Sequence, residues 1–173
     1  MPNTAFLDLI DCTQDDVNLR ETFAHFPSGI AALSAIIDAE PRIVVASSFQ
    51  VGISAQPPLV MFAVQHTSTS WPKLRLAPRV GVSVLAEKHR GVVHQLSSRT
   101  VADRFAGVAT TTTASGAHLI DGAAVHFECH LNAEIQAGDH TIVLLQVAGM
   151  RHYPDTNPLV WHGSSLRTLA PAE

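Results

Sequence analysis

One run of strictly alternating polarity constrains the fold of this chain more than any other feature. In the sequence VHFECHLNAEIQ, from Val125 to Gln136, apolar side chains occupy every second position from Phe127 to Ile135 and polar side chains lie between them. A period of two is that of an extended strand, whose successive side chains point to opposite faces. One apolar and one polar face are typical of an antiparallel sheet packed on one side. We therefore expect a long strand here, a turn at the following AGD, and a partner strand over HTIVLLQVAGM.

Most of the remaining chain also has the character of short strands. Apolar, β-branched segments recur as GIAALSAII, RIVVASSF, LVMFAVQ and RVGVSVLA, and a turn containing Asp38 and Pro41 is expected between the first two. Short helical pieces are expected within TSWPKLRLA, KHRGVVHQLSS and TVADRFAG. The sequence TTTTASGAH, from Thr110, has the composition of a polar surface loop. Several short strands with few helices predict a small, mainly β, antiparallel barrel with short flanking helices.

An amphipathic helix is expected near the N-terminus. Thr13 has the character of an N-cap with an aspartate three residues on, and Leu19, Phe23 and Phe26 follow at helical spacing. In this interpretation residues 1–13 form a flexible arm, and the whole chain is a single domain.

Composition narrows the classes of function. Apolar residues make up 46% of the chain and charged residues only 15%, which favours an oligomer that buries apolar surface against a partner chain. The net charge of −4 and the scattered basic residues argue against a nucleic-acid-binding surface. The apolar runs are too short to span a bilayer and the acidic N-terminal segment does not resemble a secretory signal, so a cytoplasmic protein is expected. Cys12 and Cys129 lack metal-binding spacing and are expected to be reduced.

Several common sites are excluded by their missing motifs. The chain contains no G-x-G, no P-loop and no G-x-S-x-G elbow. His126 and His130 form the best metal pair among the ten histidines, but on a strand they would lie about 13 Å apart. We therefore expect polar-face side chains there, and no metal. His140 differs, because it follows a glycine and an aspartate at the entry to a strand, where the sheet holds a side chain at the rim.

Residues 47–58, with the sequence SSFQVGISAQPP, separate two of the predicted strands. A simple turn needs fewer residues than this and fewer hydroxyl and small side chains. Such a segment suits a surface at which a flat ligand approaches the backbone closely, with Pro57 and Pro58 fixing the chain as it re-enters the sheet.

Several segments together resemble the flavin reductase family. FAHFPSGIAALSA is similar to the opening segment of that family, and ASSFQVGISAQPPLVMFAV to its sequence around SSF and PPLV. HTSTSW, VSVLAEKH, ADRFAG, GDHTIVLLQV and NPLVWHG then follow in family order, so that the resemblance covers about Phe23 to Leu169. It implies a Greek-key antiparallel split barrel that binds FMN or FAD. It also implies a homodimer that uses NADH, or NADPH, to reduce flavin for a partner monooxygenase.

The resemblance further implies a set of site residues. Amides and hydroxyls of Ser47, Ser48 and Phe49, with Ser54, would line the isoalloxazine, because N–H donors stabilise the anionic reduced flavin. Residues 68–71, at the start of a short helix, would hold the ribityl phosphate, with Lys88 and Arg104 as nearby cations. His140 would be catalytic, facing the nicotinamide and aligning hydride transfer from its C4 to flavin N5. The implied cofactor-binding residues are Ser28, Gly29, Ser47, Ser48, Phe49, Ser54, Ser68, Thr69, Ser70, Trp71, Ser83, Lys88, Arg104, Phe105 and Trp161.

Two departures from the family pattern and two alternatives remain. Ser83 stands where the family usually has asparagine, and WHGSSLRTL lacks the tyrosine that many relatives have after the glycine. The chain could instead be a carrier that binds flavin or haem without turnover, or an oxidase that retains its flavin. The intact Gly-Asp-His sequence at 138–140 favours the reductase over the carrier.

Overall fold

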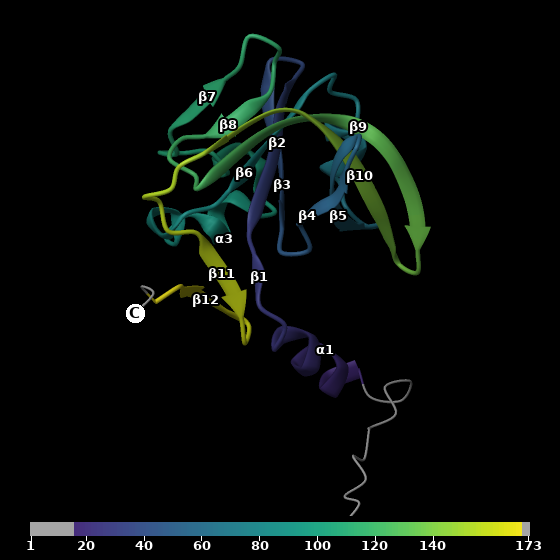
Figure 1. Cartoon of the computed structure of the whole chain (residues 1–173), viewed down its shortest axis with the longest axis vertical. Helices are drawn as coiled ribbons and strands as arrows, with labels where there is room; N and C mark the ends of the chain where they lie inside the picture. Colours follow the sequence, from purple (N-terminus) through teal and green to yellow (C-terminus); the bar gives the residue numbers. More distant parts are fainter. Residues whose placement is uncertain (1–15, 171–173) are drawn as a thin grey trace, which may run out of the picture.

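The computed structural model describes residues 16–170 and shows a mainly β, antiparallel barrel with short flanking helices, as predicted (Figure 1). A seven-stranded sheet has the order β3-β2-β6-β9-β10-β5-β4, a three-stranded sheet the order β1-β11-β12, and β7 pairs with β8. The strands are β1 (Ser28–Gly29), β2 (Ala31–Ile37), β3 (Glu40–Ala46), β4 (Gln50–Ala55), β5 (Pro58–Gln65), β6 (Val80–Val84), β7 (Thr110–Thr112), β8 (His118–Ile120), β9 (Val125–Ala137), β10 (His140–His152), β11 (Leu159–His162) and β12 (Ser165–Thr168). The helices are α1 (Asp16–Ala24), α2 (Trp71–Leu74), α3 (Val93–Leu96) and the 3-10 helices η2 (Glu87–His89) and η3 (Val101–Asp103).

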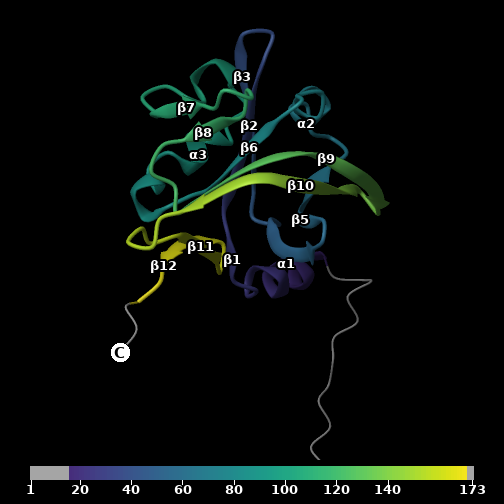
Figure 2. The same ribbon diagram turned by 45° about the horizontal axis from the view of Figure 1, so that its top comes forward.

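The alternating run forms the central hairpin of the molecule. β9 and β10 pair along their whole length, and two register shifts bend the pair so that it curves across the barrel (Figure 2). Gly138 takes a φ of +61° in the turn, a conformation that glycine adopts without strain. The apolar face is fully buried at Cys129, but Ile135 is 50% exposed because the turn end of the hairpin extends beyond the core.

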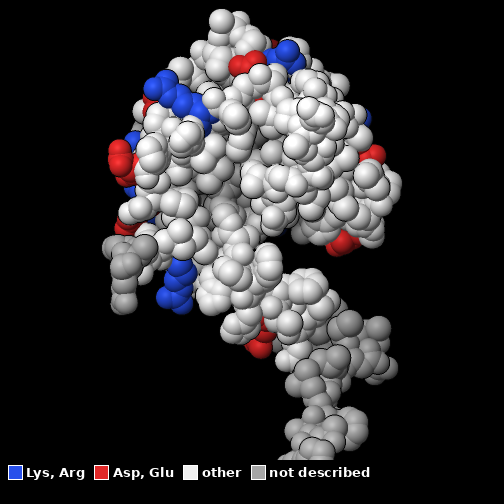
Figure 3. Space-filling view, in the orientation of Figure 1, with Lys and Arg blue, Asp and Glu red and all other residues white. Residues whose placement is uncertain are grey.

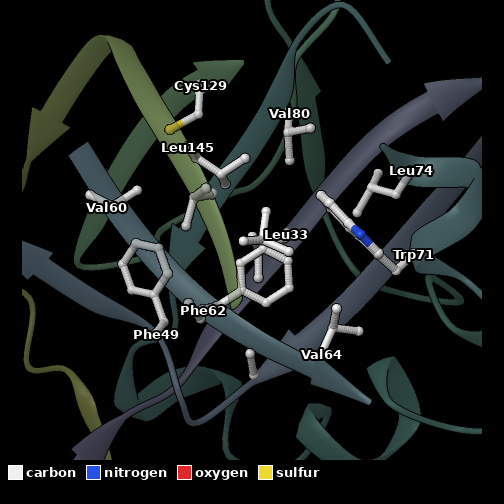
Figure 4. Packing of buried hydrophobic residues seen from close by; sticks show 14 of the residues in the cluster. Leu33, Phe49, Val60, Phe62, Val64, Trp71, Leu74, Val80, Cys129 and Leu145 are labelled. Carbon is white, nitrogen blue, oxygen red and sulfur yellow. The ribbon is translucent and has the colours of Figure 1, made fainter. Parts of the chain in front are cut away.

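Two apolar clusters hold the barrel together. The larger one lies between the strands of the seven-stranded sheet and α2, with Phe62 beside Leu33 and edge-on to Trp71 at a ring-centroid distance of 5.1 Å (Figure 4). The smaller one packs α3 and β11 against the other side of β2 and β3, around Ile43 and Leu96. Burial of these side chains is the main source of stability, at roughly 1.5–3 kcal/mol for each large residue.

The structure corrects several of the predicted elements. Pro41 lies within β3, and the turn before it is formed by Asp38 and Ala39, both with positive φ. The polar stretch after β3 contains the edge strand β4, which pairs with β5 across a bulge. The predicted surface loop from Thr110 is wrong, because its threonines pair with β8 in a hairpin. β-branched threonines fit a pleated strand, so their polarity alone misled the interpretation.

The predicted N-terminal helix is confirmed over its described part, α1. This helix extends away from the barrel and does not cover it (Figure 1). Phe23 and Phe26 are 68% and 66% exposed, so neither packs on the core. The predicted N-cap Thr13, the arm before it and Cys12 lie outside the described residues. Within the described residues, no helix is long and apolar enough to cross a membrane.

The barrel is open between β3 and β5, which are not hydrogen-bonded neighbours in the sheet order. The chain crosses this opening immediately after β3. There the Ser48 hydroxyl donates to the Ala63 carbonyl at 3.1 Å and accepts from the Ala63 amide at 3.0 Å. One serine side chain thus takes the place of a ladder pair and leaves the rest of the opening accessible.

Candidate functional site

A cavity of about 850 Å³ occupies the opening between β3 and β5. This volume lies within the range of cofactor and small-molecule sites. Its lining comes from residues 43–48 on and after β3, residues 63–65 and 67–70 on and after β5, residues 96, 97, 99 and 104 of the helical segment, and His140. Serine and threonine side chains are prominent in this set, and it contains no aspartate or glutamate.

The backbone after β3 is the part of the lining that is most available to a ligand. The amides of Ser47, Ser48 and Phe49 make no hydrogen bond within the described residues. The Ser48 hydroxyl is already committed to Ala63. Phe49 is 8% exposed and packs its ring against Phe127, so it anchors the segment from the core side. The free N–H groups, more than the hydroxyls, are therefore suited to an electron-rich ring edge.

Arg104 is the best-positioned cation of the cavity. Its Nε donates to the Ser98 carbonyl at 2.7 Å, and its Nη1 donates to the Ile43 carbonyl at 3.1 Å and to Ser70 Oγ at 2.8 Å. Burial, and then the charge of Arg42, hold the pKa of Arg104 below its ordinary value. The guanidinium is thus fixed in place, with Nη2 left for an anion.

The serine and threonine turn before α2 lies beside this arginine. Ser68, Thr69 and Ser70 line the cavity, and Ser68 Oγ accepts from the Trp71 amide at 3.2 Å. α2 has only four residues, so its dipole contributes less than the sequence suggested, and Arg104 supplies most of the positive charge. The Trp71 side chain points into the core, where its Nε1 donates to Glu134 at 2.8 Å.

His140 lies at the rim of the cavity, where β10 begins opposite Gln65 at the end of β5. Its Nδ1 is 2.7 Å from Asp139 Oδ1, so Nδ1 carries the proton and Nε2 remains for a ligand. The hydrogen bond from His140, followed by its charge, holds the pKa of Asp139 below its ordinary value. Because the aspartate is exposed, this pair orients the imidazole more than it stabilises the fold.

The structure does not bring the other expected residues into the cavity. Ser83 is fully buried and its Oγ accepts from the Ile120 amide at 2.9 Å. Phe105 packs edge-on against His118, and the side chain of Lys88 lies over Gly122. Ser54 pairs with Leu59 on the outer edge of β5. Ser28 and Gly29 do meet Trp161, but in the ladder between β1 and β11.

Sequence reasoning missed several cavity residues, among them two polar ones, and one charged neighbour. Thr67 and Arg99 line the cavity, and Arg42 lies close enough to Arg104 to affect its pKa. In the sequence each arginine is an isolated basic residue, which has the character of a solvated side chain. Only the tertiary structure places them together.

His126 and His130 both lie on β9, so the predicted strand placement of this pair is confirmed. Within the described residues, no group of three histidine, cysteine, aspartate or glutamate side chains could hold a metal ion. The expectation that His126 lies on a wet face is wrong, because it is 9% exposed and its Nε2 donates to the Ile120 carbonyl at 2.8 Å. The β7–β8 hairpin meets that end of β9, because Ile120 accepts from His126 and the Ser115 hydroxyl donates to Glu128 at 2.6 Å.

The sequence and the fold are both similar to those of known flavin reductases. The flavin reductase like domain matches residues 23–170. An NADH-dependent FAD reductase from Streptomyces globisporus is 32% identical, over 95% of this chain and 91% of the relative. A reductase subunit of a flavin-dependent monooxygenase from Rhodococcus jostii is 27% identical, over 91% of this chain and 80% of the relative. The solved structure of the Streptomyces globisporus NADH:FAD oxidoreductase with NAD and FAD fragments has a TM-score of 0.85 at 32% identity, covering 95% of this chain and 98% of that one.

Proposed function

This chain belongs to the flavin reductase family, and from that premise we propose that it is an NAD(P)H-dependent flavin reductase. It takes a hydride from NADH, or from NADPH, reduces FMN or FAD, and supplies the reduced flavin to a partner monooxygenase. The names of its relatives support this assignment, since they include an NADH-dependent FAD reductase and the reductase subunit of a monooxygenase.

The cavity in the barrel opening is the observation that carries the proposal. It combines free backbone amides at Ser47 and Ser48, a fixed cation at Arg104 and an oriented imidazole at His140. A flavin needs N–H donors at its pyrimidine edge and a cation at its phosphate, and both are present in one cavity without a competing carboxylate.

The residues of this chain bind and align the two nucleotides. When bound, the flavin supplies the hydride-accepting chemistry. The amides after β3 would hold its electron-rich edge, and Arg104 with Ser70 would hold its phosphate. His140, with Nδ1 fixed by Asp139, would present Nε2 as an acceptor for the nicotinamide nucleotide. No proton transfer by a side chain is required, so alignment is the main contribution of the protein.

A homodimer is part of this proposal. Large apolar side chains are exposed at several places, among them Phe23 at 68%, Val51 at 58% and Met150 at 80%. Figure 3 shows a largely uncharged face that is hollowed where α1 leaves the barrel. Exposed apolar surface of this kind is typical of a face covered by another protein chain. Size-exclusion chromatography with light scattering checks the dimer.

The direct test mixes purified protein with NADH and either FMN or FAD and follows the loss of NADH absorbance. We expect oxidation of NADH that depends on added flavin. Flavin binding without NADH oxidation would identify the carrier instead, and a flavin that stays bound through purification and turnover would identify the oxidase.

A second test concerns the proposed role of His140. His140→Ala is expected to slow flavin reduction by tenfold or more, on the order of the cost of lost alignment, while the flavin Kd changes by less than about twofold. His152→Ala is the matched control, because His152 is the exposed residue at the other end of the same strand. Weaker flavin binding with an unchanged rate would contradict the placement of His140 beside the nicotinamide.

A further inference from the structure

A second cavity lies at the end of the central hairpin that is farthest from its turn. It has a volume of about 340 Å³ and is lined by the β7–β8 hairpin, the first residues of β9, the last residues of β10 and Tyr153. This β8–β9 cavity shares no lining residue with the cavity in the barrel opening, and the proposed reductase function does not use it. Its volume lies at the lower end of the range for small-molecule sites.

Gly149 leaves one side of the β8–β9 cavity open. It lies within β10 opposite Glu128, and the nearest atom that an added Cβ would meet is the Glu128 Cβ, at an ordinary contact distance of 3.7 Å. Its φ lies outside the left-handed region, so neither the backbone nor the nearby register shift requires a glycine here. A glycine inside a strand weakens the strand and often marks a place where a ligand approaches the backbone closely.

His126 supplies a hydrogen-bond acceptor to the cavity. It is 9% exposed, and its Nε2 donates to the Ile120 carbonyl at 2.8 Å, so Nδ1 of the neutral imidazole carries no proton. Within the described residues, the partner of Nδ1 is the Tyr153 hydroxyl at 3.4 Å, which is longer than a well-formed hydrogen bond. A ligand hydroxyl at a normal distance would satisfy this buried nitrogen better.

The charges around the cavity are balanced by the protein itself. Glu128 pairs with Arg79 at 3.3 Å, and Asp121 accepts from the Thr111 hydroxyl at 2.7 Å. The Arg151 guanidinium lies over a neighbouring tyrosine ring, 5.2 Å from its centroid, and adds a second positive charge beside the two acidic side chains. With two charges of each sign, the cavity has no excess of either sign to select an ion.

We propose that the β8–β9 cavity is a second ligand site, which takes an uncharged aromatic compound that bears a hydroxyl group. The hydroxyl donates to His126 Nδ1, and the ring occupies the space that Gly149 leaves open. Leu119 lines the cavity, and so does Met150, which is 80% exposed and lies at its mouth. Aliphatic and thioether side chains of this kind make favourable contacts with an aromatic ring. This site is additional to the proposed reductase function and does not depend on it.

The test is an NMR titration of the backbone amides of the full chain with 4-methylphenol, which gives both the Kd and the location of the ligand. 4-Methylanisole has the same ring but cannot donate, so it should bind about fivefold more weakly, the cost of one hydrogen bond. Gly149→Leu should weaken 4-methylphenol binding about tenfold or more, because its side chain fills the cavity. Ala148→Leu is the matched control, since it adds the same side chain at an exposed position outside the lining, and its Kd should change less than about twofold.

Amide shifts centred on residues 119–128 and 149–153, with these affinities, would support the proposal. A Kd for 4-methylphenol weaker than about 1 mM overturns it. Equal binding of 4-methylanisole removes the role of His126, and tighter binding of 4-methylbenzoate removes the preference for an uncharged compound, so either result also overturns it.

Displacement of 4-methylphenol by saturating FMN would place the ligand in the barrel opening and overturn the second site, while the reductase assignment stands. Absence of flavin-dependent NADH oxidation in the wild type overturns the reductase assignment alone. Gly149→Leu should keep the NADH oxidation rate of the wild type, which checks that this variant is folded, and the titrations of the wild type do not depend on it.

Discussion

Ser48→Ala should open the barrel at the point where the flavin cavity begins. The Ser48 hydroxyl makes two hydrogen bonds with the backbone of Ala63, at 3.0 and 3.1 Å, and these fix the segment between β3 and β4 to β5 beyond the last ladder pair, Gln50–Met61. A net hydrogen bond contributes about 0.5–1.5 kcal/mol, so the loss of both should lower the free energy of unfolding by about 1–3 kcal/mol. The free amides of residues 47–49 would lose their fixed position, and flavin binding should weaken as well.

Urea denaturation with comparison of m-values measures the first effect, and flavin fluorescence titration measures the second. Ser47→Ala is the matched control, since Ser47 is exposed, lines the same cavity and makes no side-chain bond within the described residues. It should change stability by less than about 0.5 kcal/mol. A Ser48→Ala variant as stable as Ser47→Ala, with the same flavin Kd, would refute the bridging role.

Three further predictions follow from single residues. Gly52 has a φ of +74°, and a Cβ atom added there would meet open space. Gly52→Val should therefore lower the free energy of unfolding by about 1–2 kcal/mol through backbone strain alone, and Gly52→Asn by clearly less. Equal losses of the two variants in urea denaturation would point to another cause. Burial holds the pKa of His89 below its ordinary value, so the unfolded state binds more protons. The free energy of unfolding should therefore fall as pH drops below about 6.5. His89→Gln should reduce this dependence of unfolding free energy on pH, and an unchanged dependence would exclude His89 as its source. Burial raises the pKa of Cys129 to about 12. In a Cys12→Ser variant, a thiol reagent should therefore react with Cys129 only after denaturation. Rapid reaction of the native protein would contradict this burial.

Elements that bury one face were predictable, and elements that only pair their backbones were not. The β9–β10 hairpin follows from the alternation around Cys129, whose side chain must be dry. β4 and β7 are polar or glycine-containing segments that become strands because a neighbouring strand offers them hydrogen bonds. No periodicity in their own sequence marks that choice.

The candidate site shows the same division. The serines at 47 and 48, the turn at 68–70, Arg104 and His140 were expected from the family resemblance, and the structure brings them into one cavity. Ser83 was expected in the cavity from the resemblance, but its hydroxyl is buried, where it accepts from the Ile120 amide. Arg42 and Arg99 could not be found from sequence, since only the tertiary structure places these isolated basic residues in or near the cavity.

The central claim is that flavin reduction takes place in the opening between β3 and β5. Its most direct test is the rate of flavin-dependent NADH oxidation in Ser47→Trp. Ser47 is an exposed residue of the cavity lining, so the indole should fill the cavity with little change in stability. Ser165→Trp, at an exposed position of β12, is the control. We predict a loss of about a hundredfold or more in Ser47→Trp, on the order of what misplaced reactants cost, and a wild-type rate in the control. A wild-type rate in a folded Ser47→Trp would show that the reaction takes place elsewhere.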